Sequence, residues 1–390
     1  MTTKASNLRL AKRLDEVGFS DIVQIRNKVM ALRAAGEKVH LLHGGEPYFE
    51  TPEPIKYAAI QGLVENQTHY APSSGIAPLR EALAKKLTEK NNIPTTPDQV
   101  IATVGGSQAL YGAFQSVLDP GDDALVFAPY WTPIADLIRG AQARPLLVPT
   151  STARRNGIAA TLAQFSTPNT RCIYYNTPQN PSGVVFTRAE AEEVAAFALE
   201  RDLIVIADEA YEDLVYDGAH FSIASLPGMA ERTITCYTFS KTYGMTGWRG
   251  GYAQAPEPFM TALRKIVLYS TNGVTTFVQT AMLQALKTPE SEIAWRREEY
   301  RKRRELLVTG LNAVGLICDP PAGAFYAFPN VEKIHKNSRT AAEILLEKAH
   351  IATIPGSVFG AQGEGHLRFG YALPIPEIEA CVAALKDFLG

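Results

Sequence analysis

The chain has 390 residues, and its 38 Lys and Arg residues against 40 Asp and Glu residues give a formal net charge of −2. This length is ample for a buried core that needs no disulfide or metal support. Because a near-neutral chain offers no basic stripe, we expect no nucleic-acid partner. No apolar run reaches the roughly 20 residues of a membrane helix, and the N-terminus shows no signal-peptide pattern, so we expect no membrane partner.

The four cysteines are far apart and form no CxxC pair, and no histidine stands near them at metal-ligand spacing. The seven histidines show no HExxH or clustered pattern. We therefore expect reduced thiols, no metal site and a cytoplasmic protein.

Short runs that are apolar on both faces alternate with helical patterns, and such runs are typical of buried parallel strands. The predicted strands cover residues 99–104, 124–127, 172–175, 203–207 and 233–237, and helices are expected at 107–118 and 188–200. Strands alternating with helices predict an α/β fold with a mostly parallel central sheet in a large domain.

The pattern changes after residue 286. A long amphipathic helix is expected from about residue 289 to 310, and we interpret its run of arginines and glutamates as a solvated face. Short strands and helices near 340–349 and 375–389 predict a smaller α+β domain. We divide the chain into an N-terminal arm that completes part of the small domain (1–45), a large domain (46–286) and the C-terminal small domain (287–390).

The segment GGSQAL at residues 105–110 follows a predicted strand directly and opens a helix. Free backbone N–H groups and the positive end of the helix dipole favour an anion there. The segment is neither a Walker loop nor a GxGxxG fingerprint, so ATP and NAD are not supported. Taken alone, it would be interpreted as an ordinary helix start capped by Ser107.

Three further polar segments follow predicted strands, at the edge where open α/β sheets bind ligands. Lys241 has small neighbours that could desolvate its amine and make it a nucleophile. Asp208 and Tyr211 end the most apolar strand, and Asn180 stands in an NPSG turn. Individually these residues are also compatible with a surface lysine, a helix-capping aspartate and a plain Pro/Gly turn.

Together, the segments resemble class I/II aminotransferases of fold type I, which depend on pyridoxal 5′-phosphate (PLP). The resemblance covers nearly the whole chain from about residue 44, with its motifs in the family's order. These motifs are YAPSSG (70–75), GGSQAL (105–110), NPSG (180–183), DEAY (208–211), SKTYGMTGWRGG (240–251) and HLRFGYA (366–372). The resemblance implies a PLP-binding large domain, a small α+β domain and a homodimer.

The resemblance implies a role for each matching residue at the cofactor ring. Lys241 matches the lysine that forms the Schiff base and moves the substrate proton. Asp208 matches the partner of the pyridinium nitrogen. Tyr211 and Asn180 match the residues that bond the ring oxygen, and Asn180 also approaches the substrate.

For the cofactor phosphate, the resemblance implies contacts from Gly106, Ser107, Gln108 and Arg249. Tyr70 matches a tyrosine that reaches the phosphate from the other subunit, which implies a dimer with shared sites. Thr238 keeps the hydroxyl of the serine that the family often has three residues before the lysine.

An aromatic residue is expected to stack on the ring and approach the substrate. Trp131 is favoured, with Tyr130 as the alternative. Arg368 matches the arginine that binds the substrate α-carboxylate, a role suited to a planar bidentate donor. Gly45 would offer its backbone N–H to the same carboxylate.

One departure from the family pattern concerns the substrate. Enzymes of this subgroup that act on acidic substrates commonly have Lys where this chain has Ser107, and residues 269–279 supply no replacement Arg or Lys. We therefore expect transfer between a neutral or aromatic L-amino acid, rather than aspartate, and a 2-oxo acid.

Two alternatives stay open at this point. A lyase, cyclase or oxidase acting on an amino acid could use the same scaffold, since these reactions diverge only after the substrate carbanion forms. A transcriptional regulator with an aminotransferase-like domain is disfavoured because the first 44 residues show no helix-turn-helix pattern.

Overall fold

The structure is a computed structural model that describes residues 11–18 and 21–390. In this part of the chain, the central sheet has seven strands in the order β2-β8-β7-β6-β5-β3-β4. Strand β8 runs antiparallel to both neighbours and the other pairs are parallel, which confirms the predicted sheet. The strands are β2 (Val100–Val104), β3 (Asp123–Ala128), β4 (Arg144–Pro149), β5 (Thr170–Asn176), β6 (Ile204–Asp208), β7 (Thr233–Thr238) and β8 (Gly250–Gln254).

The sequence analysis did not predict β4 and β8, and both strands lack a continuous apolar run. Strand β4 is an edge strand that begins with Arg144 and Pro145 and is only half-buried over most of its length. Strand β8 begins with two glycines. Because Gly and Pro are depleted in strands, neither segment carries a strong local signal.

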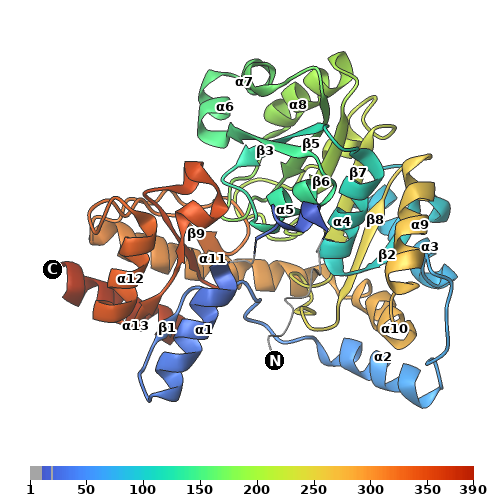
Figure 1. Ribbon diagram of the computed structural model, residues 1–390. Helices are drawn as coiled ribbons and strands as arrows, with labels where there is room; N and C mark the ends of the chain where they lie inside the picture. Colours follow the sequence, from blue (N-terminus) through green and yellow to red (C-terminus); the bar gives the residue numbers. More distant parts are fainter. Residues whose placement is uncertain (1–10, 19–20) are drawn as a thin grey trace, which may run out of the picture.

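Helices cover both faces of the sheet (Figure 1). They are α3 (Ala77–Glu89), α4 (Gly105–Val117), α5 (Pro133–Gly140), α6 (Thr150–Asn156), α7 (Ile158–Phe165), α8 (Arg188–Glu200), α9 (Phe259–Thr271) and α10 (Thr276–Ala285), and α2 (Glu53–Val64) packs on α10. Alternate strand residues enter separate cores, so Tyr174 packs with α4, α5 and α9 and its neighbour Tyr175 packs with α6, α7 and α8.

The C-terminal elements form a smaller α+β unit, with a sheet in the order β11-β12-β9. They are α11 (Glu290–Ala313), β9 (Tyr326–Ala327), α12 (Ser338–Ala349), β10 (Ile351–Ala352), β11 (Ile354–Pro355), β12 (Leu367–Gly370) and α13 (Ile375–Leu389). Short 3₁₀ helices cover Lys12–Leu14, Pro97–Gln99, Ile223–Ser225, Gly356–Phe359 and Ala361–Gly363.

Part of the N-terminal arm lies beside this smaller unit in Figure 1, whereas its 3₁₀ helix Lys12–Leu14 contacts α5 on the large sheet. It contains α1 (Asp21–Ala34) and β1 (His40–Leu41), and β1 pairs in parallel with β10. Residues 1–10, 19 and 20 of the predicted arm lie outside the described residues. The division of the chain at residues 45 and 286 stays a prediction, because it concerns units of folding.

The expectation of a solvated face on α11 was wrong for three arginines. Arg296, Arg303 and Arg304 are buried. Arg303 donates to the carbonyl oxygen of Leu373 at 2.8 Å, and its guanidinium lies 4.5 Å from the ring centroid of Tyr48. Long arginine stems can be buried when the head group keeps polar partners, and sequence periodicity does not show those partners.

All four cysteines are free and buried. In the described part of the chain, no helix is long and apolar enough to cross a membrane.

Candidate active site

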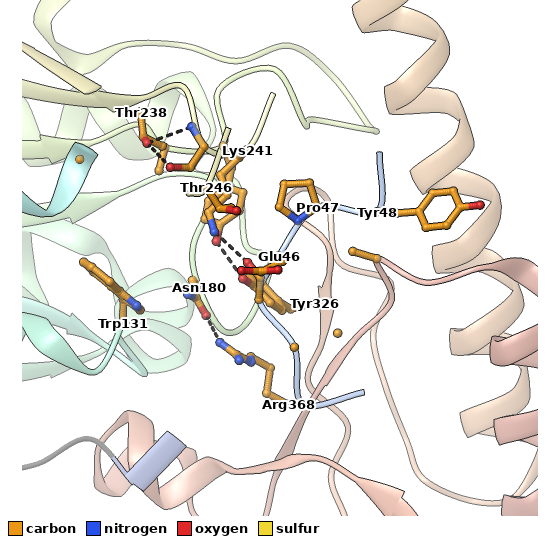
Figure 2. Close-up of a pocket in the computed structure, with 18 of the residues that line it drawn as sticks. Glu46, Pro47, Tyr48, Trp131, Asn180, Thr238, Lys241, Thr246, Tyr326 and Arg368 are labelled. Atoms are coloured by element: carbon orange, nitrogen blue, oxygen red, sulfur yellow. Dashed lines mark hydrogen bonds between the residues drawn. The ribbon is translucent and has the colours of Figure 1, made fainter. Parts of the chain in front are cut away.

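The site lies where neighbouring strands of the sheet end. Strand β5 ends at Asn176, β6 ends at Asp208, and β7 leads into the segment that carries Lys241. Because these strands are parallel neighbours, their carboxyl ends meet at one edge, as ligand sites in open α/β sheets require. They border a cavity of about 890 Å³, part of which is shown in Figure 2.

Most predicted site residues meet at this cavity. Those that line it are Gly45, Gly106, Ser107, Trp131, Asn180, Asp208, Tyr211, Thr238, Lys241, Arg249 and Arg368. Two predicted residues do not line it in this single chain. The side chain of Gln108 accepts from Val104 N and donates to Ser270 and Thr271 hydroxyls instead. Tyr70 is 94% exposed.

The start of α4 forms an anion seat. No acidic residue stands in the first turn, and no side chain caps its amides. Gly105 has φ +73°, and a Cβ there would clash with the guanidinium of Arg249. Arg249 therefore adds a full positive charge beside the positive end of the helix dipole. The arrangement suits a phosphate group.

Lys241 lies at the centre of the cavity. Its Nζ donates a 2.8 Å hydrogen bond to the carbonyl oxygen of Gly45. A Cβ on Gly45 would meet the hydroxyl of Tyr326 at 3.1 Å and Nη2 of Arg368 at 3.9 Å. The backbone of Gly45 thus passes between the lysine and the arginine, where a larger side chain would crowd the cavity.

Asp208 is buried at the end of β6. Tyr174 Oη donates to its Oδ2 at 2.7 Å, and the amide of Ala210 donates to its Oδ1 at 3.2 Å. Burial raises the pKa of Asp208 to about 6, although the Tyr174 hydrogen bond opposes that rise. A carboxylate in such a place is a strong partner for a cationic ring N–H.

Tyr211 and Asn180 border the space between Lys241 and Arg368. The hydroxyls of Tyr211 and Tyr326 share a 2.9 Å hydrogen bond, and burial raises the pKa of Tyr211. Asn180 Oδ1 accepts a 3.1 Å hydrogen bond from Nη1 of Arg368, as Figure 2 shows. The Asn180 side-chain amide is therefore oriented by the arginine.

Arg368 is a buried cation that lacks an anion. It is 3% exposed, and its Nε has no hydrogen-bond partner. Nη2 donates to the carbonyl oxygen of His43 at 3.1 Å, and no carboxylate of the described residues pairs with the guanidinium. Burial lowers the pKa of Arg368. Because buried charges are ordinarily paired, this geometry calls for an anionic ligand.

Comparison with known proteins decides the family. Residues 37–385 match the family model for aminotransferase class I and II. The chain belongs to this family. It is 39% identical over 389 residues to an aspartate/prephenate aminotransferase of Thermus thermophilus, covering 98% of this chain and 99% of that one. It is 38% identical over 387 residues to aromatic-amino-acid aminotransferase 2 of Thermococcus litoralis, covering 98% of both.

Solved structures agree. The T. thermophilus aspartate aminotransferase with maleate superimposes with a TM-score of 0.92 at 38% identity, covering 98% of this chain and 99% of that chain. An aromatic aminotransferase from Pyrococcus horikoshii gives a TM-score of 0.87 at 37% identity, covering 93% and 98%. The predicted family, fold and aminotransferase activity are confirmed, and so is the cofactor, since members of this family use PLP.

The aminotransferase cavity fits PLP on its own geometry. The start of α4 and Arg249 offer a phosphate seat, and Asp208 offers a carboxylate for a ring nitrogen. Lys241 offers an amine, and Trp131 lines the cavity whereas the buried Tyr130 does not. The positive charge of Arg249 suits the anionic phosphate of PLP, and the negative charge of Asp208 suits its cationic ring nitrogen.

The sequence analysis missed several residues of the aminotransferase site. Ser240 lines the cavity and bonds the hydroxyl of Thr238 at 2.9 Å, and its place beside Lys241 could have suggested it. Tyr326 reaches the site by pairing with Gly370 across the small sheet. Tyr174 lies behind Asp208. No local sequence signal identifies Tyr326 or Tyr174, because both contacts are set by strand register.

Proposed function

We propose that this aminotransferase moves the amino group of a neutral or aromatic L-amino acid to a 2-oxo acid. The main observation behind this proposal is the small set of positively charged side chains that line the cavity. Among the described residues that line it, the Lys and Arg side chains are Lys241, Arg249 and Arg368. Each has a task at the amine, the phosphate or the α-carboxylate, so none is left for a second substrate carboxylate.

The rest of the wall supports the same substrate class. Ser107 stands at the start of α4, and apolar side chains complete much of the lining. Those side chains are Leu41, Leu110, Trp131, Leu373 and Pro374. The relatives' names include both aspartate and aromatic substrates, so family membership leaves both classes open. An apolar wall favours a substrate side chain without charge.

For the cofactor, we assign the amides of Gly106, Ser107 and Gln108 and the guanidinium of Arg249 to the phosphate. Thr238 also lines the cavity and lies next to Gly106, since a Cβ on Gly106 would meet Cβ of Thr238 at 3.3 Å. Trp131 would stack on the ring. These contacts orient the cofactor, whose ring withdraws electrons from the bond that breaks at the substrate Cα.

The remaining residues act on the substrate and on the ring. Arg368 and the Gly45 N–H hold the α-carboxylate, so the Cα–H bond faces Lys241. The Lys241 amine would hold the cofactor at rest, and it is placed to remove and return the proton at the substrate Cα. Asp208 keeps a proton on the ring nitrogen, and Tyr211 and Asn180 donate to the ring oxygen. Asn180 also lies beside the substrate carboxylate through its bond to Arg368.

We further propose a homodimer in which Tyr70 completes the partner's site. Tyr70 is 94% exposed, and α2, which packs on α10, presents further large apolar side chains to solvent. They are Tyr57, Ile60, Leu63 and Val64. A contiguous apolar face of this kind is typical of a protein interface. We place the enzyme in the cytoplasm, which four free buried cysteines support.

A panel of single amino acids tests the function. The holoenzyme is incubated with each amino acid and no acceptor, and the products are quantified. We expect stoichiometric pyridoxamine phosphate from this half-reaction. In steady-state assays with a 2-oxo acid acceptor, we expect kcat/KM at least tenfold higher for phenylalanine than for aspartate, because an unpaired carboxylate is costly to bury. Steady ammonia release would overturn the transfer reaction, and a preference for aspartate would overturn the substrate class.

A further inference from the structure

Asp208 has two sides that meet different partners. One side lines the cavity, and the other receives the hydroxyl of Tyr174 at Oδ2, 2.7 Å away. The Ala210 amide supplies the other hydrogen bond, at 3.2 Å to Oδ1. Tyr174 is 1% exposed and does not line the cavity, so its hydroxyl can act on a bound ligand only through Asp208.

The fold fixes this contact. In the register of β5 and β6, Asn176 stands opposite Asp208 and Tyr174 stands opposite Ile206. Residues two apart in a strand share a face, so Tyr174 and Asp208 are diagonal neighbours on one face of the sheet, within reach of a long side chain. The ring of Tyr174 packs against Phe114, which holds the hydroxyl in place.

We propose that Tyr174 is a positioning residue that keeps Asp208 ionised, so that the proton shared by the pair resides on the cofactor's ring nitrogen. This inference rests on the proposed assignment of Asp208 to that nitrogen. A hydroxyl that donates to a carboxylate stabilises its anion and lowers its proton affinity. The same hydrogen bond sets the orientation of the carboxylate towards the cavity.

Burial of Asp208 acts against the Tyr174 hydrogen bond, because burial favours the protonated carboxyl group. Burial pushes the pKa of Asp208 up to about 6, close to neutral pH. Without the Tyr174 hydroxyl, Oδ2 loses its donor, the proton affinity of Asp208 rises further, and the shared proton moves from the ring nitrogen to the carboxylate. The ring would then be neutral and would withdraw electrons less strongly.

The test measures the ring nitrogen directly. Apoprotein is reconstituted with PLP labelled with ¹⁵N in the ring, and the ¹⁵N chemical shift is compared between wild type and Tyr174→Phe. We expect the signal of Tyr174→Phe to move towards that of an unprotonated pyridine. Titration of apoprotein with PLP should show binding roughly tenfold weaker, the size expected for a lost hydrogen bond to a charged group.

Tyr175→Phe is the matched control. Tyr175 is the next residue of β5, is fully buried on the opposite face, and has a hydroxyl without a hydrogen-bond partner. Its variant should keep the wild-type ¹⁵N signal and PLP affinity. Should Tyr174→Phe fold poorly, 3-fluorotyrosine at position 174 retains the ring and the donor and should keep the wild-type signal, and a displaced signal there would count against the inference.

Asp208→Asn separates this inference from the assignment on which it rests. If Asp208→Asn shifts the ¹⁵N signal and Tyr174→Phe leaves it at the wild-type position, the role of Tyr174 is overturned and the assignment of Asp208 stands. If Asp208→Asn leaves the signal in place, the assignment itself fails.

Discussion

The Nζ of Lys241 lies 2.8 Å from the carbonyl oxygen of Gly45, 196 residues earlier in the chain. Lys241 follows a strand of the large sheet, whereas Gly45 follows β1, which pairs with the C-terminal strand β10. The contact therefore brings the amine next to the segment that approaches Arg368. Lys241 and Arg368 therefore line the same cavity, as the proposed mechanism requires.

Lys241→Ala should abolish covalent attachment of the cofactor. Borohydride treatment of wild type should leave PLP on the peptide that contains Lys241, as detected by mass spectrometry. In the variant we expect no labelled peptide, loss of the visible absorbance band, and a fall in turnover of at least about 10³-fold, because the proton acceptor is lost. Lys265→Ala, on the exposed side of α9, should retain labelling and turnover; equal labelling in both variants would contradict the assignment.

Arg368→Gln should weaken substrate binding. Leaving a carboxylate without its buried partner costs enough to raise KM for amino acids by on the order of 10²-fold. Arg368→Lys should recover only part of this loss, since an ammonium lacks the bidentate geometry. The rate with an amine that has no carboxylate should stay unchanged. A uniform loss with both substrates would point to a folding defect instead.

Ser107→Lys should shift specificity towards acidic substrates. A lysine at the start of α4 would add a cation to a cavity in which the other described Lys and Arg residues are already assigned. We expect the ratio of kcat/KM for aspartate to that for phenylalanine to rise roughly tenfold or more. Ser107→Met, with similar length and no charge, should leave the ratio unchanged or lower. An equal rise in both variants would show that charge is not the cause.

Tyr70 can be tested by mixing defective chains. We consider a heterodimer of one Lys241→Ala chain and one Tyr70→Ala chain. If Tyr70 crosses the interface, both substitutions fall in one of the two sites, and the other site keeps the native Lys241 and Tyr70. We expect such heterodimers to regain up to about half of wild-type activity while each homodimer stays impaired. If Tyr70 served its own chain, both sites would be defective and no activity would return.

Asp208 gives the apoprotein a pH dependence with a definite sign. Its pKa is raised from 3.8 to about 6, so between these pH values the folded state holds a proton that the unfolded chain has lost. Its contribution to stability is therefore greatest at low pH and falls as pH rises through that window. Relative to wild type, apo Asp208→Asn should gain on the order of 3 kcal/mol in unfolding free energy between pH 4 and 7, measured in urea. Parallel pH profiles for the two proteins would contradict this.

Local sequence was sufficient for the parts of the molecule that depend on neighbours in the chain. Apolar runs indicated five strands of the central sheet, and the two glycines that open α4 indicated the anion seat. Polar residues that follow different strands could be grouped into one site from the sequence, because parallel strands place their carboxyl ends together. Strands β4 and β8 were missed because sheet pairing, rather than local propensity, makes them strands.

The amino-acid sequence by itself determined the family and the cofactor, and it singled out Lys241 as the candidate for the cofactor lysine. Only the tertiary structure decided which side chains support them: Tyr174 behind Asp208, Tyr326 beside Tyr211, and buried arginines on a helix expected to be solvated on that face. The physical reason is that these contacts join residues far apart in the chain. Their hydrogen bonds depend on strand register and packing, and neither is encoded in a local pattern.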